Sequence, residues 1–324
     1  VFDNTQNRVG LVTETLAQNR TNFHPTNFLL LGIPGLEDVH ILISIPLCFF
    51  YLLALMGNCA LIFIIKTDHL HQPMYLFLTM FSLNDLMLRT TTLPQILSLF
   101  WFNCREIIFK ACLIQIFFIH SLSTIESGFL LVMAFDYVTS CNPLQHSTIL
   151  THGGIMALSL AIALGGVILL TPHPFLLSLP YCKTNAIAHT YYEFMALIKL
   201  ACANTRIHRY FALIGNSLII GTDVTCIFLS YVQILHTVFS LPSKDARLKT
   251  LSTWGSHVCV ILTFYIPALF SFLTHHFSRH IPRHTHILLA NMCLLVPAML
   301  NPVIYGVRTK QIRECVIQLF MTKV

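Results

Sequence analysis

Residues 133–144 read Met-Ala-Phe-Asp-Tyr-Val-Thr-Ser-Cys-Asn-Pro-Leu, and they close a long apolar segment. That segment, about residues 107–139, exceeds the roughly 20 apolar residues that a helix needs to cross ~30 Å of hydrocarbon. Inside lipid, an isolated segment can satisfy its own backbone hydrogen bonds only as a helix. We therefore expect one membrane-spanning helix here, with Asp136 in its last turns.

Six further apolar segments of similar length flank this one. They cover about residues 40–65, 73–100, 151–172, 206–239, 248–274 and 285–306. The prediction is an all-α bundle of seven transmembrane helices, which places the two ends of the chain on opposite sides of a membrane. The expected organisation is an extracellular tail at 1–26, the seven-helix domain at 27–307, and a cytoplasmic amphipathic helix and tail at 308–324.

Composition supports a membrane protein and disfavours several other classes. The 324 residues are 55% hydrophobic and 10% charged, whereas soluble domains carry about 25% charged residues. The net charge of +6 is spread along the chain, unlike the basic face of a nucleic-acid-binding protein. The 11 cysteines form no Cys-x-x-Cys pair, and no nucleophile–base pair or nucleotide loop suggests an enzyme.

A transporter or channel is a weaker alternative. Its charged pathway would consist of four residues in apolar segments, namely Asp85, Arg89, Glu126 and Asp223. Many transporters contain internal repeats, and none is visible in this chain.

Several motifs, in order and across all seven segments, carry a resemblance to a known family. They are Gly32-Ile33-Pro34-Gly35-Leu36-Glu37, Gly57-Asn58, Leu70-His71-Gln72-Pro73-Met74-Tyr75, the stretch around Asp136, Lys249-Thr250-Leu251-Ser252-Thr253, and Pro297-Ala298-Met299-Leu300-Asn301-Pro302-Val303-Ile304-Tyr305. Over about residues 22–322 the chain resembles class I olfactory receptors, which are rhodopsin-like G-protein-coupled receptors. The resemblance implies a plasma-membrane receptor for small organic odorants that signals through a stimulatory olfactory-type G protein, with its N-terminus outside and its C-terminus in the cytoplasm.

The resemblance also implies an interior polar site, formed by Asn58, Asp85, Glu126 and Asn301. A carboxylate in hydrocarbon is costly, so such acids normally face the bundle interior and have partners. The site either binds a cation, such as sodium, or a proton, or it is a polar network that keeps the helices in register. Arg89 lies four residues after Asp85 on the same helix face, and we expect it to pair with Asp85 or Glu126 and displace any sodium ion. No other cofactor is expected.

The implied ligand site lies around two histidines, His120 and His276. His276 occupies the position at which relatives that bind carboxylic acids carry an arginine. We therefore expect a weaker, pH-dependent preference for carboxylic acids, because histidine loses its charge above pH ~6.5. The alternative for His120 is a polar residue of the core. The expected apolar wall comprises Phe118, Ile119, Ile266, Phe270 and Phe272.

The switch region departs from the family pattern. The family has Asp-Arg-Tyr at the end of the third helix, but here Asp136 is followed directly by Tyr137. The missing arginine would contact the G protein, so the alternative function is a receptor-fold membrane protein that cannot couple. The other expected switch residues are Tyr231, Pro302 and Tyr305, with the sixth helix moving about Pro267.

Cysteine usage also departs from the family. Cys182 and Cys202 match a loop disulfide of the family, but Cys112 lacks its usual partner, because Tyr192 stands at that position. Asn19 begins the glycosylation signal Asn-Arg-Thr. Together with the start at Val1, these departures are typical of a decayed or divergent copy of a receptor gene.

Overall fold

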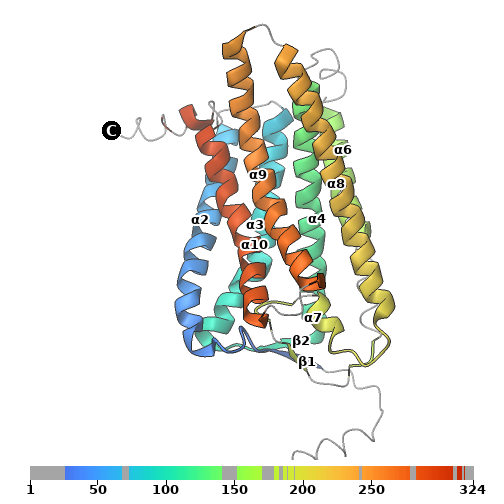
Figure 1. Ribbon diagram of the computed structural model, residues 1–324. Helices are drawn as coiled ribbons and strands as arrows, with labels where there is room; N and C mark the ends of the chain where they lie inside the picture. Colours follow the sequence, from blue (N-terminus) through green and yellow to red (C-terminus); the bar gives the residue numbers. More distant parts are fainter. Residues whose placement is uncertain are drawn as a thin grey trace, which may run out of the picture.

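Seven long helices form one bundle in this computed structural model (Figure 1). The structure describes residues 26–67, 73–140, 152–169, 179–181, 185–187, 189–192, 194–240, 243–277, 282–308, 312–315 and 317. The helices are α2 (His40–Thr67), α3 (Pro73–Phe102), α4 (Phe109–Ser140), α6 (His152–Leu169), α8 (Arg206–Ser240), α9 (Lys244–Phe277) and α10 (Arg283–Arg308). Each one coincides with a predicted apolar segment, which confirms the all-α seven-helix bundle.

The outward faces of the helices carry large apolar side chains, as expected for contact with lipid. On α8 these exposed residues include Ile207, Phe211, Ile214, Leu218 and Phe228. By length and composition, four stretches of the described chain can cross a membrane: Glu37–Thr67, Phe109–Asp136, Arg206–Gln233 and His284–Gly306. Two shorter apolar helices cover Gly153–Ile168 and Val258–Phe270.

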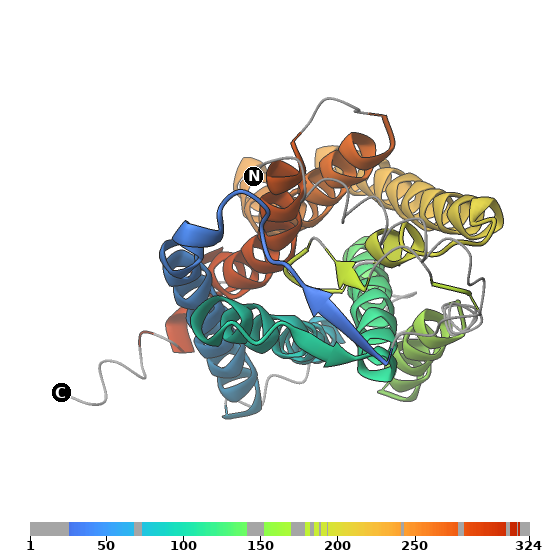
Figure 2. The same ribbon diagram turned by 90° about the horizontal axis from the view of Figure 1, so that it is seen from below.

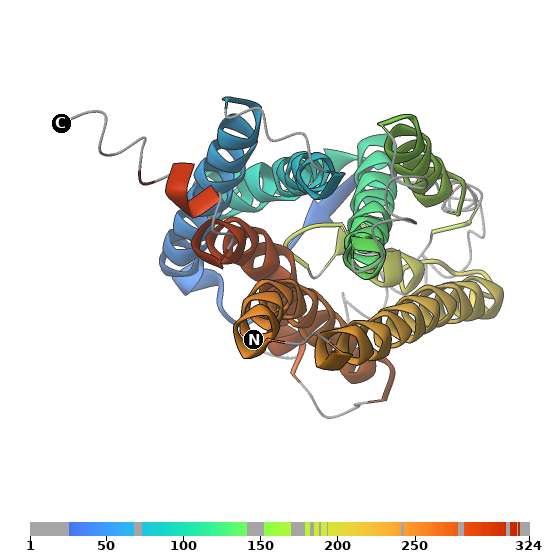
Figure 3. The same ribbon diagram turned by 90° about the horizontal axis from the view of Figure 1, so that it is seen from above.

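One end of the bundle is covered by a small sheet. Strand β1 (Asn27–Leu30) pairs antiparallel with β2 (Glu106–Ile108) and parallel with β3 (Ala186–Ile187), in the order β2-β1-β3. Figure 2 shows β1 crossing this end, which we call the sheet end. Figure 3 shows the opposite, far end, where α2, α4, α8 and α10 finish. Sequence reasoning did not predict the sheet, because strands of four, three and two residues are too short to show a hydrophobic period.

A turn after β1 joins the sheet to the bundle and explains the Gly-Ile-Pro-Gly motif. Gly32 has a φ of 79°, and a Cβ on it would lie 2.5 Å from the His40 ring. The His40 Nε2 accepts a hydrogen bond of 3.1 Å from the Ile33 amide, and its ring stacks on Phe100 of α3 at 4.5 Å. Glycine is required here both for its positive φ and for the space that the imidazole fills.

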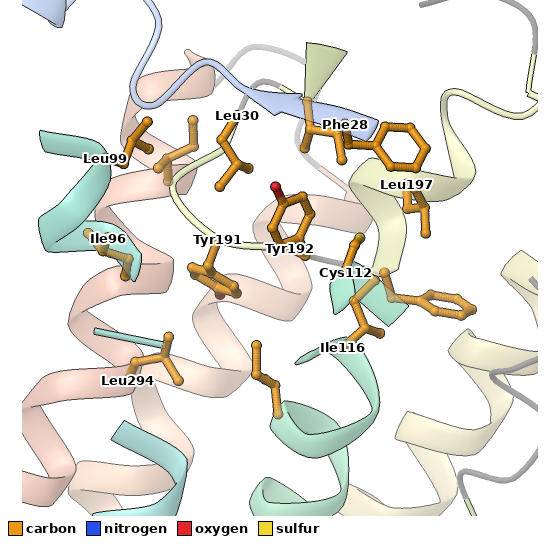
Figure 4. Packing of buried hydrophobic residues seen from close by; sticks show 14 of the residues in the cluster. Phe28, Leu30, Ile96, Leu99, Cys112, Ile116, Tyr191, Tyr192, Leu197 and Leu294 are labelled. Atoms are coloured by element: carbon orange, nitrogen blue, oxygen red, sulfur yellow. The ribbon is translucent and has the colours of Figure 1, made fainter. Parts of the chain in front are cut away.

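The core consists of two apolar clusters separated by polar residues. The sheet-end cluster joins the sheet to the adjacent halves of α3, α4 and α10, and Figure 4 shows its packing around Leu30, Ile96, Ile116, Tyr192 and Leu294. The far-end cluster includes Leu61, Phe77, Leu130, Val260 and Tyr305. Near the boundary between them, on α2, α3, α4 and α10, lie buried polar side chains, among them Asn58, Asp85, Arg89, Glu126 and Asn301. We call these five residues the polar layer.

Three glycines allow neighbouring helices to approach closely. A Cβ on Gly57 of α2 would lie 2.9 Å from the Pro302 Cβ of α10. Cβ atoms on Gly128 of α4 and Gly166 of α6 would lie 2.7 Å from Ile162 and Ile125, respectively, across the α4–α6 contact. Small residues at such crossings are typical of membrane helices, because lipid itself provides no hydrophobic drive for association.

The Gly57 contact generates a first prediction. Gly57→Ala should lower the free energy of unfolding by about 1–3 kcal/mol, because the added methyl group meets the rigid Pro302 ring. Thermal unfolding of the detergent-solubilised protein, followed by circular dichroism, would measure the change. Gly215→Ala is the matched control, since a Cβ there meets nothing within 4 Å. A loss of stability as large in Gly215→Ala would contradict this explanation.

Candidate functional site

The centre of the polar layer is an arginine shared by two buried acids. An Arg89 terminal guanidinium nitrogen (Nη2) lies 3.2 Å from Asp85 Oδ1 and 3.4 Å from Glu126 Oε1. Arg89 is 2% exposed, and neither acid is exposed at all. Asp85 and Arg89 are one turn apart on α3, and Glu126 reaches them from α4. Arg89 thus pairs with both acids, whereas the sequence had left the choice between them open.

One asparagine connects this ionic cluster to α10, and a second connects α10 to α2. The Asn301 side-chain amide donates to Asp85 Oδ2 at 3.0 Å. The Asn58 amide donates to the carbonyl oxygens of Ala298 and Ala54, at 3.1 and 2.9 Å. Of the five residues predicted for the interior polar site, the structure brings Asp85, Arg89, Glu126 and Asn301 into contact, whereas Asn58 bonds to the backbone of α10.

The same geometry makes the cluster a poor sodium site. One guanidinium nitrogen already lies against an oxygen of each carboxylate, in the position that a shared cation would take. A second cation there would be repelled by Arg89. Within the described residues, no group of three metal-ligating side chains is assembled for any ion.

A second polar cluster joins α4, α8 and α9. Asp223 Oδ2 accepts hydrogen bonds from the hydroxyl groups of Ser127 and Tyr265, the latter at 3.1 Å, and the two hydroxyls lie 2.8 Å apart. We call these three residues the Asp223 cluster. Sequence reasoning considered Asp223 only as part of a transport pathway and did not find its partners. Its signal was a lone carboxylate in an apolar helix, which normally has partners inside the bundle.

The predicted ligand residues fall into three groups. His120 of α4 is half-buried, and its ring meets the edge of Phe194 with centroids 6.3 Å apart. Ile119 beside it is buried in the sheet-end cluster. Three residues of the predicted pocket wall, Phe118, Ile266 and Phe270, are instead 47%, 59% and 53% exposed, so they lie on outward helix faces. The side chains of Phe272 and His276 lie outside the described residues, so their place in the pocket stays a prediction.

A cavity of about 910 Å³ opens at the sheet end, between α8 and the short helix α7 (Phe194–Ile198). Its lining includes the apolar residues Met195, Ile198 and Leu213 and the cationic residues Lys199, Arg206 and Arg209. Of the predicted ligand residues whose side chains the structure describes, none is among those that line it.

The switch residues lie at the far end. Asp136 is 3% exposed, and α4 continues as a helix past it to Ser140, although the Tyr137 side chain is outside the described part. Tyr305 is buried in the far-end cluster, and Tyr231 packs against the same cluster. Pro302 contacts the Gly57 position of α2. Among the described residues of the C-terminal segment, 312–315 are helical, and Ile312 is fully buried.

Two of the three cysteines singled out from the sequence, Cys112 and Cys202, lie in the described residues. Cys202 is disulfide-bonded, and because Cys182 lies outside the described residues, their pairing remains a prediction. Cys112 is free and fully buried. Tyr192 packs in the same cluster (Figure 4), and burial raises the pKa of its hydroxyl group. A neutral phenol therefore stands near Cys112, where the family pattern has a second cysteine. Asn19 lies outside the described residues.

Comparison with known proteins gives a consistent result. The family model described as olfactory receptor matches residues 47–323. Human olfactory receptor 52R1 is 50% identical over 306 residues, which are 94% of this chain and 97% of that protein. Human olfactory receptor 52N1 is 48% identical over 94% of this chain and 96% of its own length. Human olfactory receptor 52K1 is 50% identical over 95% of this chain and 99% of its own length.

The ionic cluster generates a second prediction. Arg89→Met should destabilise the protein by about 3–5 kcal/mol, because it leaves two unpaired carboxylates in the membrane interior. The triple variant Arg89→Met, Asp85→Asn, Glu126→Gln should recover much of this loss. Thermal unfolding in detergent would compare the three proteins.

Sodium dependence gives the control. Replacing choline by sodium should leave the unfolding temperature of the unmutated protein unchanged and raise that of Arg89→Met. Equal stabilisation of both proteins by sodium would show that Arg89 does not take the place of a bound cation.

Proposed function

Since this chain belongs to the olfactory receptor family, and so is a multi-pass plasma-membrane odorant receptor of the G-protein-coupled class, we propose that its odorants are small carboxylic acids. The observation that carries this proposal is the position of His120. Its imidazole is half-buried beside Phe194, on a helix face that borders the apolar sheet-end cluster. A histidine in such surroundings can bind the polar end of a ligand whose alkyl chain packs on apolar side chains.

The expected acid preference follows from the chemistry of histidine. A protonated imidazole attracts a carboxylate and donates a hydrogen bond to it, whereas a neutral one offers a single weaker bond. Free histidine titrates near pH ~6.5 and a carboxylic acid near ~4.3, so both partners are charged only between about these values. The response to an acid should therefore weaken as the pH rises above ~6.5.

The proposed orientation places the sheet end outside the cell and the far end in the cytoplasm. Ligand binding near His120 would then be transmitted to the G-protein side through α4, α8 and α9. The Asp223 cluster supports this path, because its hydrogen bonds join these three helices, and Tyr265 lies two residues before Pro267. A proline inside a membrane helix is a natural position for bending. We propose a stimulatory G protein as the partner.

A second candidate function is a receptor-fold protein that does not couple. The observation that favours it is the direct succession of Asp136 and Tyr137 within a helix that continues to Ser140. In a continuous helix, the loss of one residue rotates everything after it by about 100°. Residues after Asp136 would then present other faces to the G protein.

His120 gives the test of the ligand site. His120→Ala should weaken the response to octanoic acid about tenfold or more, because a charge-assisted hydrogen bond contributes roughly 1.5–3 kcal/mol. The response to 1-octanol should change less. Cyclic AMP production in cells with verified surface expression would be measured at pH 6.0 and 7.5. A response to the acid that survives both His120→Ala and His276→Ala would contradict the assignment.

The coupling motif gives a further prediction. Inserting an arginine between Asp136 and Tyr137 should raise ligand-stimulated cyclic AMP, because it restores both the cation and the register of the following residues. An alanine inserted at the same position is the matched control, since it restores register without charge. If the unmodified chain responds as strongly as the arginine variant, the shortened motif does couple and the second candidate function is wrong.

A further inference from the structure

We propose that the cavity between α7 and α8 is an outer binding site for carboxylates, at which Lys199, Arg206 and Arg209 hold the charged end of an amphiphilic acid. It is separate from the region of His120, because His120 is not among its lining residues. This outer site extends the carboxylic acid specificity proposed above, yet its occupancy can be measured without any signalling.

The cavity is lined by one face of α8 and by the α7 segment, and each of them carries both cationic and apolar side chains. On α8, Arg206, Arg209, Tyr210 and Leu213 line it, at the i, i+3, i+4, i+7 positions of one helix face. From α7 and the turn that follows it, Met195, Ile198, Lys199 and Cys202 repeat the same spacing. α8 thus contributes two of the cations and the α7 segment contributes one, in each case beside apolar side chains. This combination suits a carboxylate with an alkyl chain.

The described lining of the cavity contains positive charges and no negative charge that would balance them. Three cationic side chains line it, and no acidic side chain does. None of the three makes an ion pair with another residue of the described ranges. Lys199 also acts electrostatically on His286, at the start of α10, which adds a further titratable base at this end. Three like charges around one volume repel each other, and a bound anion relieves that repulsion.

Backbone structure keeps the cations in place. Asn204 accepts a hydrogen bond of 3.2 Å from the Arg206 amide through Oδ1, which caps the start of α8. The N-terminal end of this 35-residue helix adds a partial positive charge next to Arg206. Cys202, which also lines the cavity, is disulfide-bonded, and Ala201 beside it forms a β-bridge with Tyr181. Lys199 and the two arginines therefore project from anchored backbone.

The size and exposure of the cavity set the affinity that can be expected. A volume of about 910 Å³ lies within the range of small-molecule sites. Lys199, Arg206 and Arg209 are exposed, so water screens their charges and each contributes modestly. Weak capture at the mouth of the bundle would concentrate acids there and leave neutral odorants unaffected.

Photolabelling would test this site directly. The probe is octanoic acid with a diazirine on its alkyl chain, added to the full-length protein in phosphatidylcholine nanodiscs. Mass spectrometry should find the label on residues 195–213. Excess octanoate added before photolysis should prevent the labelling, whereas 1-octanol at the same concentration as the octanoate should not. Labelling of this segment that octanol displaces as well as octanoate does would overturn the proposal, because the cavity would then recognise only the alkyl chain.

Substitutions provide the second readout. The triple variant Lys199→Gln, Arg206→Gln, Arg209→Gln should reduce labelling of residues 195–213 roughly tenfold, which corresponds to about 1.4 kcal/mol in total, or about 0.5 kcal/mol for each exposed cation. Lys110→Gln, which removes an exposed cation at the same end but outside the cavity lining, should leave labelling unchanged. Undiminished labelling of the triple variant would overturn the proposal.

Two further arms separate this site from its alternatives. His120→Ala should keep the label on residues 195–213, so that failure of the inner ligand site is distinguished from failure of the outer one. Nanodiscs with added phosphatidylglycerol test whether a lipid headgroup is the natural occupant. If phosphatidylglycerol abolishes the labelling, and excess octanoate in nanodiscs without this lipid does not, then the cavity is a lipid site and the proposal is wrong.

Discussion

The contact of Arg89 with two buried carboxylates is the interaction on which the rest of the bundle depends. An arginine at the centre of a membrane helix costs about 2.5–3.5 kcal/mol on insertion scales, and an unpaired carboxylate there is also costly. The arrangement that brings Asp85 and Glu126 to the same guanidinium group lowers these costs. The charges therefore align α3 with α4 at one height, and Asn301 adds α10 at the same level.

This polar layer lies at the boundary between two apolar halves of the interior, which pack against different parts of the chain. The sheet-end cluster holds the three-stranded sheet, α7 and the buried Tyr192 over the mouth of the bundle. The far-end cluster contains Tyr305 and packs against Tyr231, near the end at which α4 carries Asp136. A change at one end can reach the other only through the layer or along the helices that cross it. The Asp223 cluster, which ties α8 and α9 to α4, offers one such connection.

Several motifs that were read as family signatures have a direct physical explanation in the structure. Gly57 leaves room for Pro302, and Asn58 donates to the Ala298 carbonyl group, so both residues of this pair hold α2 against α10. Gly32 leaves room for the His40 ring, which accepts a hydrogen bond from the Ile33 amide. In each case the motif itself does not identify the residue that the glycine or asparagine contacts, because that residue lies on another helix or beyond a turn. Resemblance marked these positions, and packing supplies the reason for them.

Hydropathy alone was sufficient to locate all seven helices, because a backbone in lipid must form its hydrogen bonds within each segment, and the apolar runs are therefore continuous and long. Local spacing likewise placed Arg89 beside Asp85, since residues four apart share one helix face. The sheet and the Asp223 cluster depended instead on the meeting of segments about 40 to 160 residues apart. Such meetings leave no periodic trace in the chain, and only the packing of the bundle decides them.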